Sequence, residues 1–264
     1  MIEGEIISYS SDRYGEITIA DHNGQRSLYF GNAVMQSCIL TEQPWVLQMD
    51  YSQAMMSALI FRRRPRSVLL IGLGGGSLVN FLLRACPECS IDVVEISGKV
   101  IDLAHDYFYL PKRSENLTIY NAPGQDFVKD GSGADLRYDL ILVDAFDEAG
   151  PASFLRAADF LTDCRRRLAK GGIFVVNLWN RLGDNFPALY ETVDKAFRGG
   201  TLKLLLGEVH RNAVVLAFDD PSMPRDLPSY RSEARRLRKE LAINFPKFLN
   251  YLYWQNFSAA SADK

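Results

Sequence analysis

Residues 67–77 read Ser-Val-Leu-Leu-Ile-Gly-Leu-Gly-Gly-Gly-Ser and join an apolar strand to a helix through a glycine-rich loop. Because glycine has no side chain, the backbone of such a loop can approach a bound group closely. The free amides at the start of the helix favour a polar or negatively charged group. The segment therefore predicts an open α/β sheet with a ligand site at the carboxyl ends of its strands.

The same alternation of apolar strands and helical stretches continues along the chain. We expect strands at 67–72, 90–95, 117–120, 138–144 and 172–178, and helices at 77–85, 98–108, 153–168 and 185–197. Continuous apolar strands interleaved with helices predict a mostly parallel sheet covered on both faces. Residues 201–206 and 213–218, with 207–212 as the turn, are expected to close the sheet as an antiparallel pair.

Shorter elements flank this region. Strands are expected at 15–20, 27–30 and 34–40, with a tight hairpin turn at Asn23-Gly24, and a helix at 51–61 that stops before Pro65. Three prolines at 221, 224 and 228 mark a linker, and 230–254 has a helical pattern. We therefore predict an N-terminal β-subdomain (1–50), a Rossmann-like domain (51–220) and a helical tail (221–264).

Composition excludes several classes of protein. The 264 residues are 47% hydrophobic and 23% charged, which is typical of a soluble globular chain. A net charge of −2 lacks the basic excess of nucleic-acid binders, and the apolar stretches are far shorter than the ~20 residues of a membrane span. Residues 1–10 lack the pattern of a signal peptide. We expect a cytoplasmic protein without nucleic-acid or membrane partners.

A metal site is not expected. Cys86 and Cys89 have the spacing of a metal or redox pair, but the chain has four cysteines and three histidines and offers no second pair. Plain loop cysteines are the simpler interpretation.

The spacing of the glycines narrows the kind of ligand. Gly72, Gly74 and Gly76 alternate as in S-adenosylmethionine-type nucleoside sites, whereas the third glycine of the dinucleotide fingerprint would fall at Ser77. A dinucleotide is therefore the second choice. A tight strand-to-helix turn without any ligand is the remaining alternative.

Two acids stand at the ends of apolar strands. Glu95 ends the second strand, where a carboxylate can accept from both ribose hydroxyls, each bond contributing about 1.5–3 kcal/mol. Asp144 ends the strand expected at 138–144 and is expected beside the glycine loop, facing the reactive end of the nucleoside. The alternatives are an idle surface acid at Glu95 and a loop cap at Asp144.

The segment from about Tyr29 to Trp179 resembles the polyamine aminopropyltransferase (spermidine synthase) family, in particular its divergent spermidine-synthase-like members. The matching pieces are Met35-Gln36-Ser37, Tyr51, the glycine loop, Val93-Val94-Glu95-Ile96, Asp144-Ala145-Phe146-Asp147 and Leu168-Ala169-Lys170-Gly171-Gly172. The resemblance implies a class I methyltransferase fold, an N-terminal β-subdomain and a homodimer.

The resemblance also implies roles for single residues. Asp144 helps to take a proton from the attacking amine, Asp147 binds the polyamine, and Tyr51 positions the amine. The residues implied in binding the nucleoside are Gln36, Gly72, Gly74, Gly75, Gly76, Glu95, Ile96 and Gly124. The chemistry needs such acids, because an alkylamine with a pKa near 10.4 must lose a proton before attack, at a cost of about 4–5 kcal/mol at neutral pH.

Three positions depart from the family pattern. Gly75 stands where the family has the aspartate that holds the ammonium of the decarboxylated donor. Pro123 stands where the family has an adenine-binding aspartate. Asp126 could replace that aspartate only if the loop bulges. Tyr51-Ser52-Gln53 lacks the acid that usually follows this tyrosine.

The leading hypothesis is aminopropyl transfer from decarboxylated S-adenosylmethionine to a polyamine-type amine. The loss of the acid at Gly75 removes repulsion against the carboxylate of intact S-adenosylmethionine, so methyl transfer to an amine or another small nucleophile is the first alternative. The second alternative is a noncatalytic nucleoside- or polyamine-binding protein.

Overall fold

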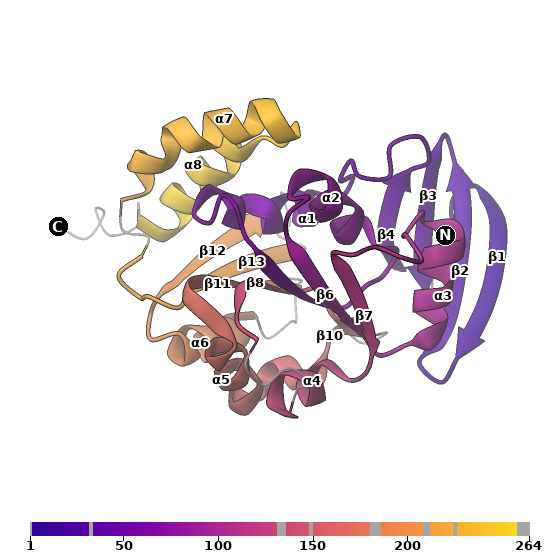
Figure 1. The fold of residues 1–264 in the computed structure, drawn as a ribbon, viewed down its shortest axis with the longest axis horizontal. Coiled ribbons are helices and arrows are strands. Elements are labelled where there is room, and N and C mark those ends of the chain that lie inside the picture. The colour runs from indigo at the N-terminus through magenta and orange to yellow at the C-terminus, as the bar shows by residue number, and fades with distance from the viewer. Residues whose placement is uncertain are drawn as a thin grey trace.

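The computed structural model describes residues 2–31, 34–130, 136–147, 150–179, 186–207, 212–223 and 226–257. These residues form a four-stranded N-terminal sheet, a seven-stranded sheet with helices on both faces, and a C-terminal pair of helices (Figure 1). Within these ranges, none of the helices has the length and apolar character that a membrane span requires.

The N-terminal sheet is antiparallel, and its strands follow one another in chain order. They are β1 (Glu5–Asp12), β2 (Gly15–His22), β3 (Gln25–Phe30) and β4 (Val34–Leu40). The expected turn is confirmed, because Asn23 and Gly24 join β2 to β3 with φ angles of 49° and 75°, which suit a tight hairpin.

A bulge interrupts the last strand of this sheet. Leu28 of β3 pairs with Ser37, whereas the next residue, Tyr29, pairs with Met35, so Gln36 is an extra residue on β4. Such bulges redirect side chains and occur often beside functional sites.

The larger sheet has the strand order β12-β13-β11-β8-β5-β6-β7. Its strands are β5 (Ser67–Ile71), β6 (Ser90–Glu95), β7 (Leu117–Asn121), β8 (Tyr138–Val143), β11 (Leu168–Trp179), β12 (Thr201–Leu206) and β13 (Asn212–Phe218). The strands from β11 to β7 are parallel, and β13 is antiparallel to both β11 and β12. The predicted fold class is therefore confirmed, and β5, β6 and β8 end at the same edge.

Helices cover both faces because both sides of each central strand are apolar. Val68 and Leu70 of β5 belong to one hydrophobic core, and Leu69 and Ile71 belong to the other. On the first face lie α1 (Asp50–Met55), the 3₁₀ turn η1 (Met56–Ile60), α2 (Ser77–Ala85) and α3 (Gly98–Tyr107). On the second face lie α4 (Gly124–Asp130), α5 (Ala158–Arg166) and α6 (Phe186–Ala196).

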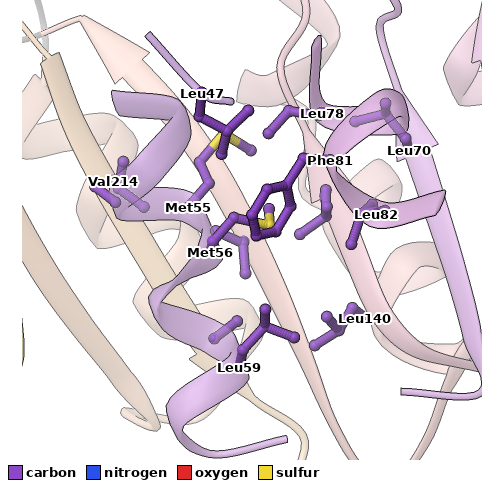
Figure 2. Close-up of a cluster of buried hydrophobic side chains, with 14 of the residues drawn as sticks. Leu47, Met55, Met56, Leu59, Leu70, Leu78, Phe81, Leu82, Leu140 and Val214 are labelled. Carbon is purple, nitrogen blue, oxygen red and sulfur yellow. The ribbon is translucent and has the colours of Figure 1, made fainter. Parts of the chain in front are cut away.

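The core on the first face joins segments far apart in the sequence. Figure 2 shows Met55 and Met56 packed beside Phe81 of α2, with Leu70 and Leu140 of the central strands in the same cluster. Met55 and Met56 are fully buried. Since unbranched methionines fill irregular gaps, this cluster fixes α1, and with it Tyr51, against the sheet.

The C-terminal segment contains η3 (Leu227–Tyr230), α7 (Arg231–Leu241) and α8 (Phe245–Phe257). The sequence predicts one helical tail, but Ala242 adopts a left-handed conformation (φ 58°) and ends α7. Helix α8 packs beside β12 at the end of the larger sheet.

Other differences from the prediction are local. The helix expected at 51–61 changes to 3₁₀ geometry after Met55, and that expected at 153–168 divides at the extended Ala157 into η2 (Ser153–Arg156) and α5. β1, α4 and the short strands β9 (Phe146–Asp147) and β10 (Gly150–Pro151) are not predicted. Most of the turn expected at 207–212, and Pro224, lie outside the described residues.

Candidate active site

A cavity of about 330 Å³ lies between the carboxyl ends of the parallel strands and the N-terminal sheet. One wall comes from the loops after β5, β6, β7 and β8, and the other from β2, β3, β4 and α1. The predicted residues that line it are Gln36, Tyr51, Gly72, Gly74, Glu95, Ile96, Gly124 and Asp144. The two sheets therefore bring together residues more than 100 positions apart.

The glycine loop passes directly beside Asp144. Gly72 has a φ of 92°, and a Cβ added there would lie 2.2 Å from the backbone oxygen of Asp144. The Asp144 amide in turn donates to the backbone oxygen of Ile71 at 2.9 Å. Only glycine fits this approach, which explains the residue at 72 and confirms that Asp144 leaves its strand beside the loop.

Glu95 is buried and held by backbone amides on both oxygens. Leu73 and Ser97 each donate an N–H to its carboxylate at 2.9 Å. Burial raises the pKa of Glu95, and these backbone bonds oppose the rise. Each carboxylate oxygen keeps a further acceptor position, so the side chain is fixed and can still accept from two hydroxyls of a bound sugar.

The Asp144 carboxyl is also held, but by side chains. The Asn177 carboxamide, itself buried, donates to Asp144 Oδ1 at 2.9 Å, and the Tyr51 hydroxyl lies within hydrogen-bonding reach of the same carboxyl. Burial raises the pKa of Asp144 to about 6, although both of these bonds lower it. At neutral pH the group is mostly an anion, and its proton affinity suits a general base.

Tyr51 links Asp144 to the bulge in β4. Its hydroxyl donates to the backbone oxygen of Gln36 at 2.9 Å, and a hydroxyl has a single proton to give to Gln36 or to Asp144. Burial, followed by the nearby carboxylate of Asp144, holds the pKa of Tyr51 well above its ordinary value. Tyr51 therefore acts as a neutral donor.

Asn177 and Asn212 are residues that sequence reasoning missed. Asn177 lies on β11 and accepts a bond from the carboxamide of Asn212 on β13 at 3.1 Å, while its own carboxamide donates to Asp144. A single asparagine in an apolar strand is a weak sign of a functional residue. The position of Asn177 inside the apolar run Val-Val-Asn-Leu was the one clue in the sequence. These contacts orient Asp144 from behind.

The loops after β6 and β7 form the far end of the cavity. Asn121 donates to the backbone oxygens of Glu95 and Ile96 at 2.9 Å each and so fixes their loop. Ile96 is 39% exposed at this apolar end, and Gln125, a residue the sequence analysis did not select, lines the cavity beside Gly124. Gln125 offers both amide donors and a carbonyl acceptor to a polar ligand.

Some predicted residues lie elsewhere. Gly75 and Gly76 do not border the cavity in the described part of the chain but pack behind the loop, where added Cβ atoms would meet Phe108 at 2.8 Å and Leu110 at 3.3 Å. The backbone of Asp147 lies in β9, but its side chain is outside what the structure describes.

The cysteine pair has the character of structural thiols, with Cys89 buried and Cys86 half-buried. Burial raises the pKa of Cys86 to about 11 and that of Cys89 to about 12, so both are protonated at neutral pH. In the portion of the chain that the structure covers, His, Cys, Asp and Glu form no cluster of three or more suited to a metal ion.

Comparisons with known proteins show one family for this chain. Residues 49–180 match the model of the spermine/spermidine synthase domain. A polyamine aminopropyltransferase of Chromobacterium violaceum is 33% identical over 246 residues, covering 93% of this chain and 92% of the relative. One from Neisseria meningitidis serogroup A is 32% identical, covering 89% and 88% of the two chains.

Solved structures share the fold. A spermidine synthase in complex with the transition-state analogue AdoDATO has a TM-score of 0.75 at 18% identity, covering 97% of this chain and 87% of its own. Human methyltransferase-like protein 13 in complex with SAH has a TM-score of 0.58 at 25% identity, covering 77% of this chain and 93% of its own. Both likenesses agree with the predicted methyltransferase-like α/β fold.

Proposed function

The chain belongs to the spermine/spermidine synthase family, which confirms the predicted resemblance, and from this premise we propose that it is an aminopropyltransferase. It transfers the aminopropyl group of decarboxylated S-adenosylmethionine to a small polyamine-type amine. The observation that carries the proposal is the presence of Glu95 and Asp144, both fixed and on either side of the glycine loop, in one cavity.

In this proposal the donor lies along the cavity from the loops after β6 and β7 to Asp144. The ribose diol binds the open acceptor positions of Glu95, and the adenine lies between Ile96 and Gln125 at the apolar end. This orientation directs the sulfonium toward Asp144. The bound AdoDATO of a structural neighbour supports decarboxylated S-adenosylmethionine as the donor.

Asp144 performs the proton transfer. It attracts the acceptor ammonium as an anion, removes one proton and releases the amine nitrogen for attack. The nitrogen forms a bond to the carbon attached to sulfur, the C–S bond breaks, and its electron pair stays on sulfur, so that methylthioadenosine leaves as a neutral thioether. Tyr51 and Asn177 hold Asp144 during this step, and in this proposal Asp147 binds a second ammonium of the polyamine.

The alternative functions are not favoured. Relatives covering about nine-tenths of the chain are named polyamine aminopropyltransferases. The methyltransferase-like neighbour matches less of the chain than the spermidine synthase does. The carboxyl of Asp144 lines the cavity and has a pKa raised to about 6, which also argues for catalysis rather than binding alone.

The assembly in this proposal follows from the resemblance, and the location follows from the composition and charge of the chain. In this proposal the enzyme is a cytoplasmic homodimer with no nucleic-acid or membrane partner, divided at about residues 50 and 220 as the sequence predicts. Light scattering of the purified protein tests the dimer. A monomer at micromolar concentration would refute that part of the proposal.

The activity is tested by release of methylthioadenosine. Purified protein is incubated with decarboxylated S-adenosylmethionine and putrescine or a longer polyamine, and we expect methylthioadenosine in equal amount to the extended polyamine. Asp144→Asn should reduce the rate by about 100-fold or more, since it removes the general base. The wild type failing to release methylthioadenosine with any amine, while binding the donor, would contradict the proposal.

A further inference from the structure

Gln125 lies at the cavity because a glycine precedes it. Gly124 is buried, and a Cβ added there would lie 2.5 Å from Cγ2 of Ile71 at the end of β5. Since glycine has no Cβ, the first turn of α4 packs directly against the end of this strand. Ile71 and Gln125 therefore both line the cavity, although they come from opposite ends of the β5–β7 region.

The loop that carries Gln125 is tied to the loop that carries Glu95. The Ala122 amide donates to the backbone oxygen of Glu95 at 3.1 Å, and the Asn121 carboxamide donates to the same oxygen at 2.9 Å. These bonds fix the spacing between Gln125 and the proposed ribose site at Glu95. A nucleoside whose diol binds Glu95 therefore presents its base to a wall of defined position.

The polar groups of this wall are uncharged. Apart from Asp144, the described lining residues on the loops after β6, β7 and β8 are Ile96, Ser97, Gly124, Gln125, Ala145, Phe146, Ala152, Ser153 and Phe154. They include no carboxylate and no cation. The Ser97 hydroxyl is engaged, because it donates to Asp12 and accepts from the Val100 amide. Gln125 is exposed, and its carboxamide makes no hydrogen bond with any residue that the structure describes.

We propose that the Gln125 carboxamide binds the base of the donor nucleoside and that the enzyme accepts 6-oxopurine as well as 6-aminopurine nucleosides. The inference rests on the proposed function, because Glu95 must hold the ribose. Adenine donates from its 6-amino group and accepts at N1, whereas hypoxanthine accepts at O6 and donates from N1. A carboxamide carries a donor and an acceptor side by side, so it matches either edge after a half-turn of the amide group.

Calorimetry with methylthioadenosine and its 6-oxo analogue methylthioinosine tests the inference. The wild type should bind the two nucleosides within about tenfold of each other, whereas a site whose polar groups fit only one pattern separates such ligands by far more. Gln125→Met keeps an unbranched side chain of similar length but removes the donor and acceptor pair. It should weaken the binding of both nucleosides by about tenfold, as expected for the loss of one or two neutral hydrogen bonds.

Asp126→Asn is the matched control, because Asp126 is exposed on the same turn of α4 but outside the described lining of the cavity. It should leave both affinities unchanged. Three results would overturn the inference: a wild type that prefers methylthioadenosine by more than about 100-fold, a Gln125→Met variant that binds both nucleosides like the wild type, or a loss confined to one nucleoside.

Methylthioadenosine release from decarboxylated S-adenosylmethionine by the wild type is measured in parallel. If this release is intact, any of the three results refutes only the role of Gln125. If the wild type releases no methylthioadenosine and binds neither nucleoside, the proposed function fails and the inference fails with it.

Discussion

Asp144 and Glu95 are both buried carboxyls of one cavity, but their partners differ in kind. Glu95 is held by two backbone amides, which cannot rotate away, whereas Asp144 is held by the carboxamide of Asn177 and the hydroxyl of Tyr51. The first arrangement suits a fixed grip on a sugar. The second leaves a carboxyl with a pKa of about 6, which can take up and return a proton.

The buried charge of Asp144 should reduce stability at neutral pH. Its native pKa of about 6 is above the ordinary value of 3.8, so the native state binds more protons than the unfolded chain between these values. The stabilising contribution of the protonated group is complete below about pH 4 and is lost as the pH rises through 6. Asp144→Asn should therefore have a free energy of unfolding larger than the wild type by up to about 3 kcal/mol at pH 8.

Urea unfolding of both proteins at pH 8 and pH 5 measures this effect. The advantage of the variant should shrink by about 1.4 kcal/mol at the lower pH. An advantage that does not depend on pH, or a variant less stable than the wild type at pH 8, would speak against a charged and buried Asp144.

Asn177 is a positioning residue whose removal should change the pH profile. Its bond lowers the pKa of Asp144 against the effect of burial. In Asn177→Leu, which keeps the branched shape of the side chain but removes the donor, we expect the acid limb of the kcat/KM profile to move from about pH 6 to a higher pH, by about one unit. Asn212→Ala, which acts through Asn177, should move it less. If the acid limb of the kcat/KM profile stays at the same pH in Asn177→Leu, the hydrogen bond from Asn177 does not set the pKa of Asp144.

At the scale of elements, the C-terminal helix protects the edge of the larger sheet. Gln255 of α8 accepts from the Leu205 amide at 2.7 Å and donates to its carbonyl at 3.1 Å. Asn256 accepts from the Lys203 amide at 2.9 Å and donates to the Lys203 carbonyl at 2.8 Å. The two carboxamides thus replace the peptide groups of a neighbouring strand and cover the edge of β12.

Removing both carboxamides should expose this edge. We expect Gln255→Leu/Asn256→Leu to lose about 2–4 kcal/mol of unfolding free energy and to self-associate. Urea unfolding and light scattering measure the two effects. Tyr251→Ser, an exposed position on the same helix, should change neither. A monodisperse and fully stable double variant would contradict the role of α8.

Elements with a continuous apolar core were predictable from the sequence, and exposed ones were not. The bounds of α2, β6 and β12 agree with the expected ranges, because apolar runs and punctuating residues define them. β1 was missed since its outer position leaves it polar and partly exposed, and α4 was missed because it follows a Pro-Gly step that indicates a loop.

The residues of the candidate site were likewise predictable only where a local sequence pattern marks them. Gly72, Glu95 and Asp144 were predictable because they follow apolar strands that end at one edge of a parallel sheet. Gln125 depends on the packing of α4 against the end of β5 and Asn177 on the pairing of β11 with β13, and neither arrangement has a local signal in the sequence.

At the scale of the whole molecule, the cavity depends on the docking of the N-terminal sheet. The Arg26 guanidinium, paired with Asp21, donates to the Tyr107 carbonyl at the end of α3 at 2.8 Å, and Ser97 bonds to Asp12 at the cavity rim. The cation also faces the negative end of the helix dipole. These contacts hold one wall of the site against the other.

Breaking the first contact should loosen the wall. Arg26→Ala is expected to lower the free energy of unfolding by about 1.5–3 kcal/mol and to weaken methylthioadenosine binding severalfold, measured by urea unfolding and calorimetry. Lys112→Ala, which removes an exposed ion pair to Asp106 of α3, should have little effect on either. Equal behaviour of the two variants would mean that Arg26 does not hold the sheet in place.

The most direct test is a crystal structure of the protein with methylthioadenosine bound. We expect both ribose hydroxyls to donate to the carboxylate of Glu95, the adenine to contact Ile96, and the sulfur to face Asp144. A nucleoside bound outside this cavity, or bound inside it with the diol away from Glu95, would contradict the account.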